Sequence, residues 1–170
     1  GVSVFYLHAR KAWLKGLSPK ENRSIPPLDY DRARRLAARC GDLSIILNGW
    51  LEKADQASVE MPGFDGIMIG RAAYRTPYVL AEMAQQIFGT ALPQRYQVAQ
   101  AMAEYANSMT KTGVPLHSIT RHMLGLYAGQ SGAKYWRRQL GEMARNADDA
   151  GNFIIDTASF CENLAAKHAA

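Results

Sequence analysis

The sequence predicts an α/β protein in which about three strand–helix units precede an all-helical region. Three short apolar runs in the first half alternate with amphipathic segments, which is typical of parallel strands joined by helices. Beyond Pro93 no segment has the pattern of a strand. The composition fits a folded chain, because 48% of the 170 residues are hydrophobic and 21% are charged. No apolar run approaches the about 18–20 residues that cross a bilayer, so we expect no membrane span.

The first predicted unit begins with a strand over residues 2–7, an apolar run rich in β-branched and aromatic side chains. A polar connection over residues 11–28 follows, and connections of this length are usually functional. Asp29 or Asp31 can cap the next helix, which is expected to run to about Arg39.

The second strand is expected over residues 44–47 and the third over residues 64–69, both of them short apolar runs. A short helix over residues 50–59 lies between them. A longer helix over residues 77–88 follows, with Pro77 in its first turn. Because the strands alternate with helices, we predict that they pair in parallel through crossover connections.

Four further helices are predicted after residues 89–93, where the pattern changes. They are expected over residues 96–110, 116–127, 133–147 and 156–168. The sequence thus predicts one domain over residues 1–90 and a helical domain over residues 91–170.

The net charge of +5 arises in one region of the chain. Residues 90–147 contain seven Lys and Arg side chains and two acidic ones. In the rest of the chain the numbers of basic and acidic side chains are equal. This asymmetry favours a polyanionic partner, and a merely solvated basic surface explains it equally well. Cys40 and Cys161 lie far apart in unrelated contexts, which predicts neither a disulfide framework nor a zinc site. A reduced, cytoplasmic setting and no bound metal are therefore expected.

Polar residues follow each predicted strand at the point where it ends. These strand-end groups are His8-Ala9-Arg10, Asn48-Gly49-Trp50 and Gly70-Arg71. Because the carboxyl ends of parallel strands meet at one edge of a sheet, these residues are expected to face one cavity. An open backbone at Gly70 and the charge of Arg71 suit a phosphate group. The alternatives are that both glycines only turn the chain and that His8 is a core histidine.

Three stretches of the chain closely resemble the tRNA-dihydrouridine synthase family, in particular its A subfamily. They are LHARKAWLKGLSPKENR at residues 7–23, DGIMIGRAAYRTPY at residues 65–78 and ITRHMLGLYAGQSGAKYWRRQL at residues 119–140. The resemblance covers nearly the whole chain. It implies the C-terminal part of a TIM (β/α)8 barrel that binds FMN, followed by a helical domain that binds tRNA. It also implies reduction of D-loop uridine to 5,6-dihydrouridine, with NADPH as the source of electrons.

The resemblance also assigns binding residues. Those expected at FMN are His8, Asn48, Gly49, Trp50, Gly70 and Arg71, the last two at its phosphate. Those expected at tRNA are Lys20, Arg23, Lys134, Arg137 and Arg138. The basic surplus over residues 90–147 would then neutralise RNA phosphates, which supplies affinity that does not depend on sequence.

The chain departs from the family pattern in two ways. Trp50 stands where the family usually has a glycine, and its indole could block approach to the flavin phosphate or turn outward. The family's barrel has eight units and its catalytic cysteine lies in the upstream half, so no catalytic residue is expected here. Three units cannot close a barrel and leave an open strand edge. We therefore expect the C-terminal portion of a longer enzyme, inactive alone, whose partner is the N-terminal half of the barrel.

Two other functions remain open from the sequence. The chain could be a non-catalytic module that binds tRNA through its basic helices. It could also belong to another FMN-barrel oxidoreductase that acts on a small molecule, although that function leaves the basic helical region unexplained.

Overall fold

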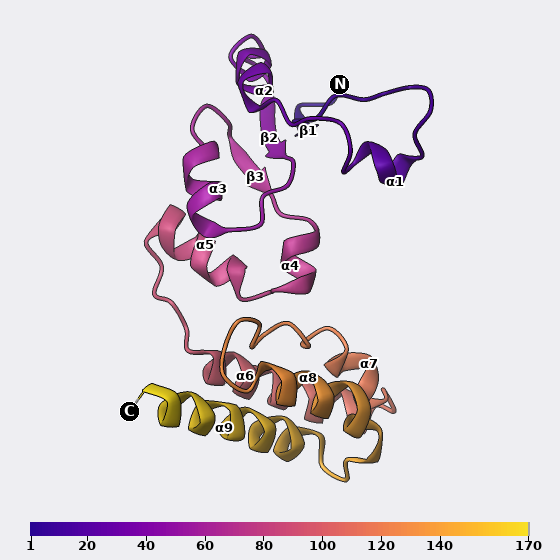
Figure 1. Ribbon diagram of the computed structural model, residues 1–170, viewed down its shortest axis with the longest axis vertical. Coiled ribbons are helices and arrows are strands. Elements are labelled where there is room, and N and C mark those ends of the chain that lie inside the picture. Colours follow the sequence, from indigo (N-terminus) through magenta and orange to yellow (C-terminus); the bar gives the residue numbers. More distant parts are fainter. Residues whose placement is uncertain (170) are drawn as a thin grey trace. The chain divides into compact units, whose positions relative to one another are not determined.

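The computed structural model describes residues 1–169 (Figure 1). The chain forms two compact units, of which the first is Gly1–Ala72 and the second begins at Ala73. All strands of the described residues lie in the first unit, and the described residues of the second unit form helices and turns.

The first unit is built on a sheet of three parallel strands in the order β1–β2–β3. The strands are β1 (Val4–His8), β2 (Ser44–Asn48) and β3 (Gly66–Met68). This confirms the predicted α/β class and parallel pairing. β3 is shorter than the predicted run of residues 64–69. Before it begins, Asp65 already pairs with Ile45 of β2, and its carboxylate accepts the Ile45 N–H at 2.7 Å.

Four helices accompany these strands: α1 (Pro19–Asn22), α2 (Tyr30–Ala37), α3 (Ala54–Glu60) and α4 (Arg71–Arg75). The predicted cap of α2 is confirmed at Asp29, whose carboxylate accepts the Arg32 N–H at 2.9 Å. The prediction that a helix starts at Trp50 is wrong, because Trp50 has φ +52° and α3 begins only at Ala54. Neither α1 nor α4 was predicted from the sequence.

The second unit contains α5 (Val79–Phe88), α6 (Arg95–Lys111), α7 (Leu116–Thr120), α8 (Ala133–Glu142), the 3₁₀ turn η1 (Met143–Asn146) and α9 (Ala150–Ala169). The predicted limits of α5 and α6 are close to these, and so is the predicted start of α8, whereas its predicted end at residue 147 is wrong because α8 stops at Glu142 and a 3₁₀ turn follows. The predicted extension of α7 to residue 127 is wrong, because residues 121–130 form successive turns with three-residue spacing. α9 begins six residues before the predicted start, since Asp149 caps it through the Asn152 N–H.

The division between the units precedes α5, whereas the sequence places the change of pattern at residues 89–93. Tyr78, just before α5, explains the difference because it belongs to the core of the second unit. Its hydroxyl donates to the Pro93 carbonyl at 2.6 Å, and the Arg95 guanidinium carbon lies 3.6 Å from its ring centre. These contacts attach the start of α5 to the helices that follow.

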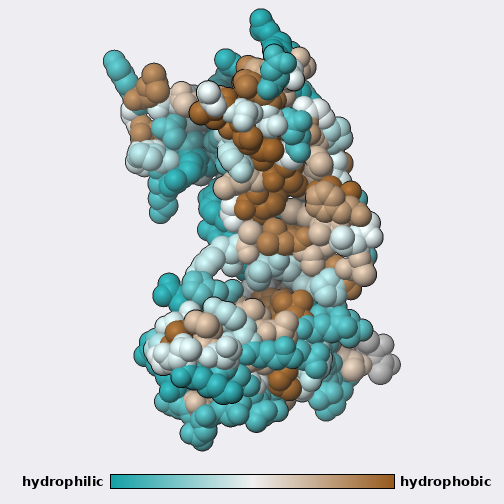
Figure 2. Space-filling view, turned by 180° about the vertical axis from the view of Figure 1, so that it is seen from behind, coloured by the Kyte–Doolittle hydropathy of each residue, from teal (hydrophilic) through white to brown (hydrophobic). Residues whose placement is uncertain are grey.

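The cores of the two units differ in size. In the second unit α8 and α6 pack against α9, around a fully buried Trp136 whose Nε1–H donates to the Met123 carbonyl at 2.8 Å. In the first unit one smaller cluster consists of Ala9, Ala33, Leu47 and Leu51, and further buried apolar residues there include Ile45 and Ala57. Figure 2 shows apolar residues gathered on the surface of the part that carries the sheet, and it shows a mostly hydrophilic surface on the helical part.

None of the helices described here combines enough length with enough apolar character to cross a bilayer.

Candidate functional site

The residues that end the three strands come together at one edge of the sheet. His8 and Asn48 are register partners across β1 and β2, and Asn48 is the partner of Met68 on β3. The Ala9 N–H donates to the Asn48 carbonyl at 2.7 Å, which continues the pairing past the strand end. Arg71 begins α4 directly after β3 and is close enough to influence the titration of His8. The parallel register thus places these side chains in one neighbourhood.

An arginine outside the predicted set completes this cluster. The Arg10 guanidinium carbon lies 5.6 Å from the centre of the Trp50 indole, and that of Arg71 lies 5.0 Å from the same centre. Arg10 also donates to the backbone carbonyls of Ser24 and Pro26, which anchors it beneath the connection of residues 11–28. Its position two residues past the end of β1 had placed it in the first strand-end group, although the family resemblance did not assign it to the flavin.

The cluster carries positive charge around a histidine that is held neutral. Burial, followed by the Arg10 guanidinium, lowers the pKa of His8 below its ordinary value of 6.5. The guanidiniums of Arg71 and Arg23 act in the same direction, and a hydrogen bond with the Asn48 side chain opposes them. The Nε2 of His8 and the Nε of Arg10 are buried and have no hydrogen-bond partner in the described chain. Unpaired buried nitrogens in a positive field suit an anionic ligand rich in oxygen acceptors.

The two glycines at the strand ends differ in what surrounds them. Gly49 is buried at φ +148°, and a Cβ there would lie 3.1 Å from Leu28 Cδ2. Its carbonyl accepts the Tyr30 hydroxyl proton, so packing already accounts for this glycine. Gly70 is exposed, and a Cβ there would meet no atom within 4 Å. Gly70 therefore leaves backbone open to a ligand next to Arg71.

The residues predicted to contact RNA fall into two groups, one in each unit. Lys20 and Arg23 are exposed at α1, on the connection of residues 11–28. Lys134, Arg137 and Arg138 share one exposed face of α8, because residues three and four apart lie on the same side of a helix. The opposite face of α8 carries buried side chains.

The connection of residues 11–28 is ordered by its own hydrogen bonds. The Asn22 side chain accepts the Trp13 N–H and donates to the Trp13 carbonyl, both at 2.9 Å. Ser18 and Glu21 form a capping box at α1. These bonds hold Lys20 and Arg23 on a defined loop.

Part of the basic surplus serves packing. Arg95 donates to the Leu126 carbonyl at 2.9 Å and approaches the Glu82 carboxylate at 3.9 Å, besides lying over Tyr78. Arg95 is therefore committed to the structure of the second unit.

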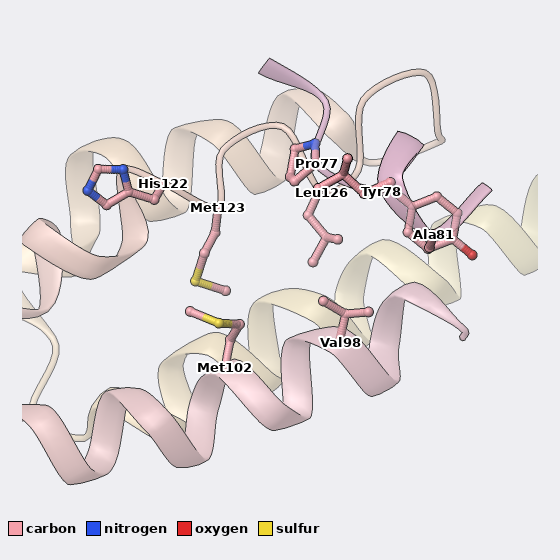
Figure 3. Close-up of a pocket in the computed structure, with 9 residues that line it drawn as sticks. Pro77, Tyr78, Ala81, Val98, Met102, His122, Met123 and Leu126 are labelled. Carbon is pink, nitrogen blue, oxygen red and sulfur yellow. The ribbon is translucent and has the colours of Figure 1, made fainter. Parts of the chain in front are cut away.

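A separate pocket of about 430 Å³ lies in the second unit (Figure 3). Its lining consists of Pro77, Tyr78, Leu80, Ala81, Val98, Met102, His122, Met123 and Leu126. The thioethers of Met102 and Met123 face one another across it (Figure 3). None of the residues predicted to bind a cofactor lines this pocket, and its apolar wall offers little to a phosphate.

The described residues contain no group of three or more His, Cys, Asp or Glu side chains that could hold a metal ion. Cys161 is fully buried in the second unit, and burial raises the pKa of its thiol to about 11. A thiol of that kind is a poor nucleophile or acid near neutral pH.

Comparison with known proteins gives consistent matches. The dihydrouridine synthase family model matches residues 1–164. A tRNA-dihydrouridine(20/20a) synthase of Vibrio cholerae is 46% identical over 160 residues, which cover 93% of this chain and 49% of the relative. The corresponding protein of Shewanella oneidensis is 47% identical over 160 residues, or 93% and 48% of the two chains. That of Escherichia coli K12 is 45% identical over 146 residues, or 85% and 42%. The chain thus spans about half the length of the curated relatives it matches, in their C-terminal portion.

Proposed function

The chain belongs to the dihydrouridine synthase family, and on that premise we propose that it is the C-terminal part of a tRNA-dihydrouridine synthase. In this proposal the strand-end cluster holds the phosphate end of FMN, and the basic face of α8 holds tRNA. The observation that carries the proposal is the gathering of His8, Asn48 and Arg71 at one sheet edge in a chain of this family.

The cluster fits the phosphate end of FMN in its donors and its charge. Arg71 supplies a guanidinium for charge-assisted hydrogen bonds, and Gly70 exposes backbone beside it. Two buried nitrogens, His8 Nε2 and Arg10 Nε, have no partner among the described residues and would gain one from a ligand oxygen. The Asn48 side chain lies beside His8 and partly offsets the lowering of the His8 pKa.

When bound, FMN supplies the hydride that reduces C6 of the uracil ring, and NADPH is the proposed source of its electrons. The residues of this chain bind and orient the flavin rather than move a proton to C5. Cys161 is fully buried in the core of the second unit, and Cys40 lies on the loop that follows α2. We therefore propose that the proton donor lies outside these 170 residues and that the chain alone does not turn over.

Exposed apolar residues on β1 support the proposal that further strands complete a barrel. Val4, Phe5 and Tyr6 are 45%, 44% and 67% exposed, although they belong to a strand of a parallel sheet. Parallel sheets are normally covered on both faces. Pairing with additional strands and covering by their helices would bury these side chains, as in a closed (β/α)8 barrel.

The basic face of α8 supports the proposed binding of a D-loop region of tRNA. Lys134, Arg137 and Arg138 are exposed together, and none of them forms a recorded salt bridge in residues 1–169. Three adjacent cations can each neutralise a phosphate and release counterions. The folded shape of the RNA, rather than its sequence, would then determine which RNA binds.

The test combines cofactor binding, RNA binding and turnover in the purified 170-residue chain. We expect quenching of flavin fluorescence on titration with FMN, tRNA affinity that falls with salt, and no dihydrouridine formed with NADPH. Arg71→Ala should weaken FMN binding, with Arg35→Ala, on α2, as the matched control. Dihydrouridine formation by this chain alone would refute the assignment of the proton donor, and unchanged FMN affinity in Arg71→Ala would refute the flavin site.

A second candidate function is a tRNA-binding module without a flavin. It is favoured by the basic face of α8, which belongs to a unit with its own core. Lys134, Arg137 and Arg138 can be changed together to Gln. The slope of the logarithm of tRNA affinity against the logarithm of salt concentration should then become shallower by about 0.7–0.9 for each phosphate contact that is lost. If RNA binding is retained in a chain that shows no FMN binding at any concentration, the module is the better description.

A further inference from the structure

Trp50 is in an unusual backbone conformation beside the strand-end cluster. With φ +52° it is the one non-glycine residue with positive φ among the described residues. Bulky side chains rarely adopt this region, and when they do the position often belongs to a functional site. Its indole is 42% exposed, so burial in a core does not explain why it is there.

The surroundings of the indole give it a defined contact. The Arg71 and Arg10 guanidinium carbons lie 5.0 Å and 5.6 Å from its ring centre, within the range of cation–π attraction. A guanidinium that lies over a ring uses its face, whereas its N–H donors point outward in its plane. The N–H donors of the exposed Arg71 therefore remain available, and so does the Arg10 Nε–H, which has no partner in the described chain, whereas Arg10 Nη1 already donates to the Ser24 and Pro26 carbonyls.

The two guanidiniums have no carboxylate to hold them. The salt bridges recorded within residues 1–169 involve Arg34 and Arg95, and neither Arg10 nor Arg71 takes part in one. Both of them nevertheless lie close enough to His8 to lower its pKa. Two unpaired cations near one another repel, and the π face of an indole partly compensates for the missing anion.

We propose that Trp50 is a positioning residue that holds the Arg10 and Arg71 guanidiniums in place for a phosphate group. With both guanidiniums over the indole, Arg71 presents its N–H donors and Arg10 its unpartnered Nε–H to the phosphate oxygens. Because Trp50 already restricts the two arginine side chains, phosphate binding loses less side-chain entropy. The inference rests on the proposed function, in which the phosphate is that of FMN. It concerns the role of the indole, which the flavin assignment leaves open between blocking the phosphate and helping to bind it.

The experiment measures the affinity of the 170-residue chain for inorganic phosphate and for FMN in four variants. Trp50→Phe keeps an aromatic face, Trp50→Leu keeps apolar bulk without one, and Trp50→Gly removes the side chain. Trp13→Leu is the matched control, because Trp13 is a similarly exposed indole with no recorded guanidinium contact. We expect Trp50→Phe to bind phosphate within about twofold of the unchanged chain, and Trp50→Leu to bind roughly three- to tenfold more weakly. Trp13→Leu should bind phosphate as the unchanged chain does.

A spectroscopic measurement separates positioning from a general structural effect. In a Trp13→Phe background two indoles remain, of which Trp136 is fully buried. Phosphate should then change the emission of Trp50 along the same curve as the affinity titration. No emission change on saturation would contradict a contact between the indole and the phosphate-binding arginines.

The possible outcomes distinguish this inference from the proposed function. Tighter phosphate binding by Trp50→Gly would show that the indole blocks the site and would overturn the inference. Equal phosphate affinities of Trp50→Phe and Trp50→Leu would also overturn the inference. The inference would fail as well if the unchanged chain did not bind phosphate. If phosphate binds with the expected order of variants but FMN does not bind, the flavin assignment fails and the role of Trp50 stands.

Discussion

The two compact units of this chain differ in how completely they bury their own apolar side chains. In the second unit Trp136, Leu140 and Ile154 are fully buried, and the buried Thr120 hydroxyl donates to the Leu140 carbonyl at 2.8 Å. In the first unit the apolar residues Val4, Phe5 and Tyr6 of β1 remain about half exposed or more. A helical unit can close a core from neighbouring segments, whereas a parallel sheet depends on strands and helices that are distant in sequence.

The difference has a consequence for the candidate site. All residues predicted to bind the cofactor belong to the sheet-bearing first unit or to its last helix, and none belongs to the large helical core. Strand register and loop hydrogen bonds set their geometry, rather than dense packing around them. Changes in the helical core should therefore affect stability strongly and phosphate binding weakly, and changes at the strand ends should do the reverse.

The largest effect is expected from a matched pair of tryptophan changes, one in each unit. Trp136→Ala removes a fully buried indole and its 2.8 Å bond to the Met123 carbonyl, which should lower the free energy of unfolding by about 3–5 kcal/mol. Trp13 is 46% exposed, so Trp13→Ala should change the free energy of unfolding by less than about 0.5 kcal/mol. Denaturant unfolding followed by far-ultraviolet circular dichroism measures both. Equal losses would contradict the contrast between the units.

A glycine pair in the second unit tests how tightly its turns are packed. At Gly125 a Cβ would lie 1.8 Å from the Arg75 carbonyl oxygen, so Gly125→Ala must displace backbone and should cost about 1–3 kcal/mol. Gly141 lies within α8, where a Cβ would meet nothing within 4 Å. Gly141→Ala should therefore stabilise the chain by about 0.5–1 kcal/mol. Thermal midpoints that shift in the same direction for both variants would be inconsistent with this packing.

Most of the difference between the sheet-bearing unit and the helical unit was predicted from the sequence, because local residue patterns determine the positions of strands and helices. Apolar runs located the three strands, and Asp29 located the start of α2. The cap at Asp149 was an equally clear signal, and neglecting it placed the start of α9 six residues too late. The end of α7 was not predictable from periodicity, because residues 121–127 continue a helical pattern that the contact of Gly125 with Arg75 interrupts.

The site was predictable in its location and less so in its membership. The rule that parallel strands end at one edge was enough to bring His8, Asn48 and Arg71 together. Arg10 was recognised at the strand end but not assigned to the ligand, because its contact with Trp50 depends on a backbone conformation with positive φ that the sequence does not reveal. The packing role of Gly49 against Leu28 likewise depends on a contact distant in sequence. Long-range contacts that involve a loop conformation leave little trace in residue order.

A smaller and local effect is expected at the connection of residues 11–28 in the first unit. Asn22→Ala removes both hydrogen bonds to the Trp13 backbone, each with a net contribution of about 1 kcal/mol or less because the pair is exposed. The loop should open more often while global stability changes little, so trypsin should cleave faster after Lys15 and Lys20. Asn22→Asp keeps the acceptor and should give an intermediate rate. Unchanged cleavage would mean that other contacts order the loop.

The smallest expected effect is a dependence of stability on pH that is confined to the first unit. Burial, and then Arg10, Arg71 and Arg23, lower the pKa of His8 in the folded chain, whereas in the unfolded chain it stays near 6.5. At a pH below about 6.5 the unfolded state therefore binds more protons, and stability falls as the pH decreases. His8→Gln removes the titration and should flatten this decline between about pH 5 and pH 7.

Hydrogen exchange can assign that decline to the sheet. The Ala9 N–H, which donates to the Asn48 carbonyl, should lose protection as the pH falls once the intrinsic pH dependence of exchange is corrected. The Trp136 indole N–H in the helical core should not follow it. In His8→Gln the protection of the Ala9 N–H should become independent of pH over the same interval. If both N–H groups lose protection together in the unchanged chain, the two units unfold as one, and their contrast in burial does not extend to their stability.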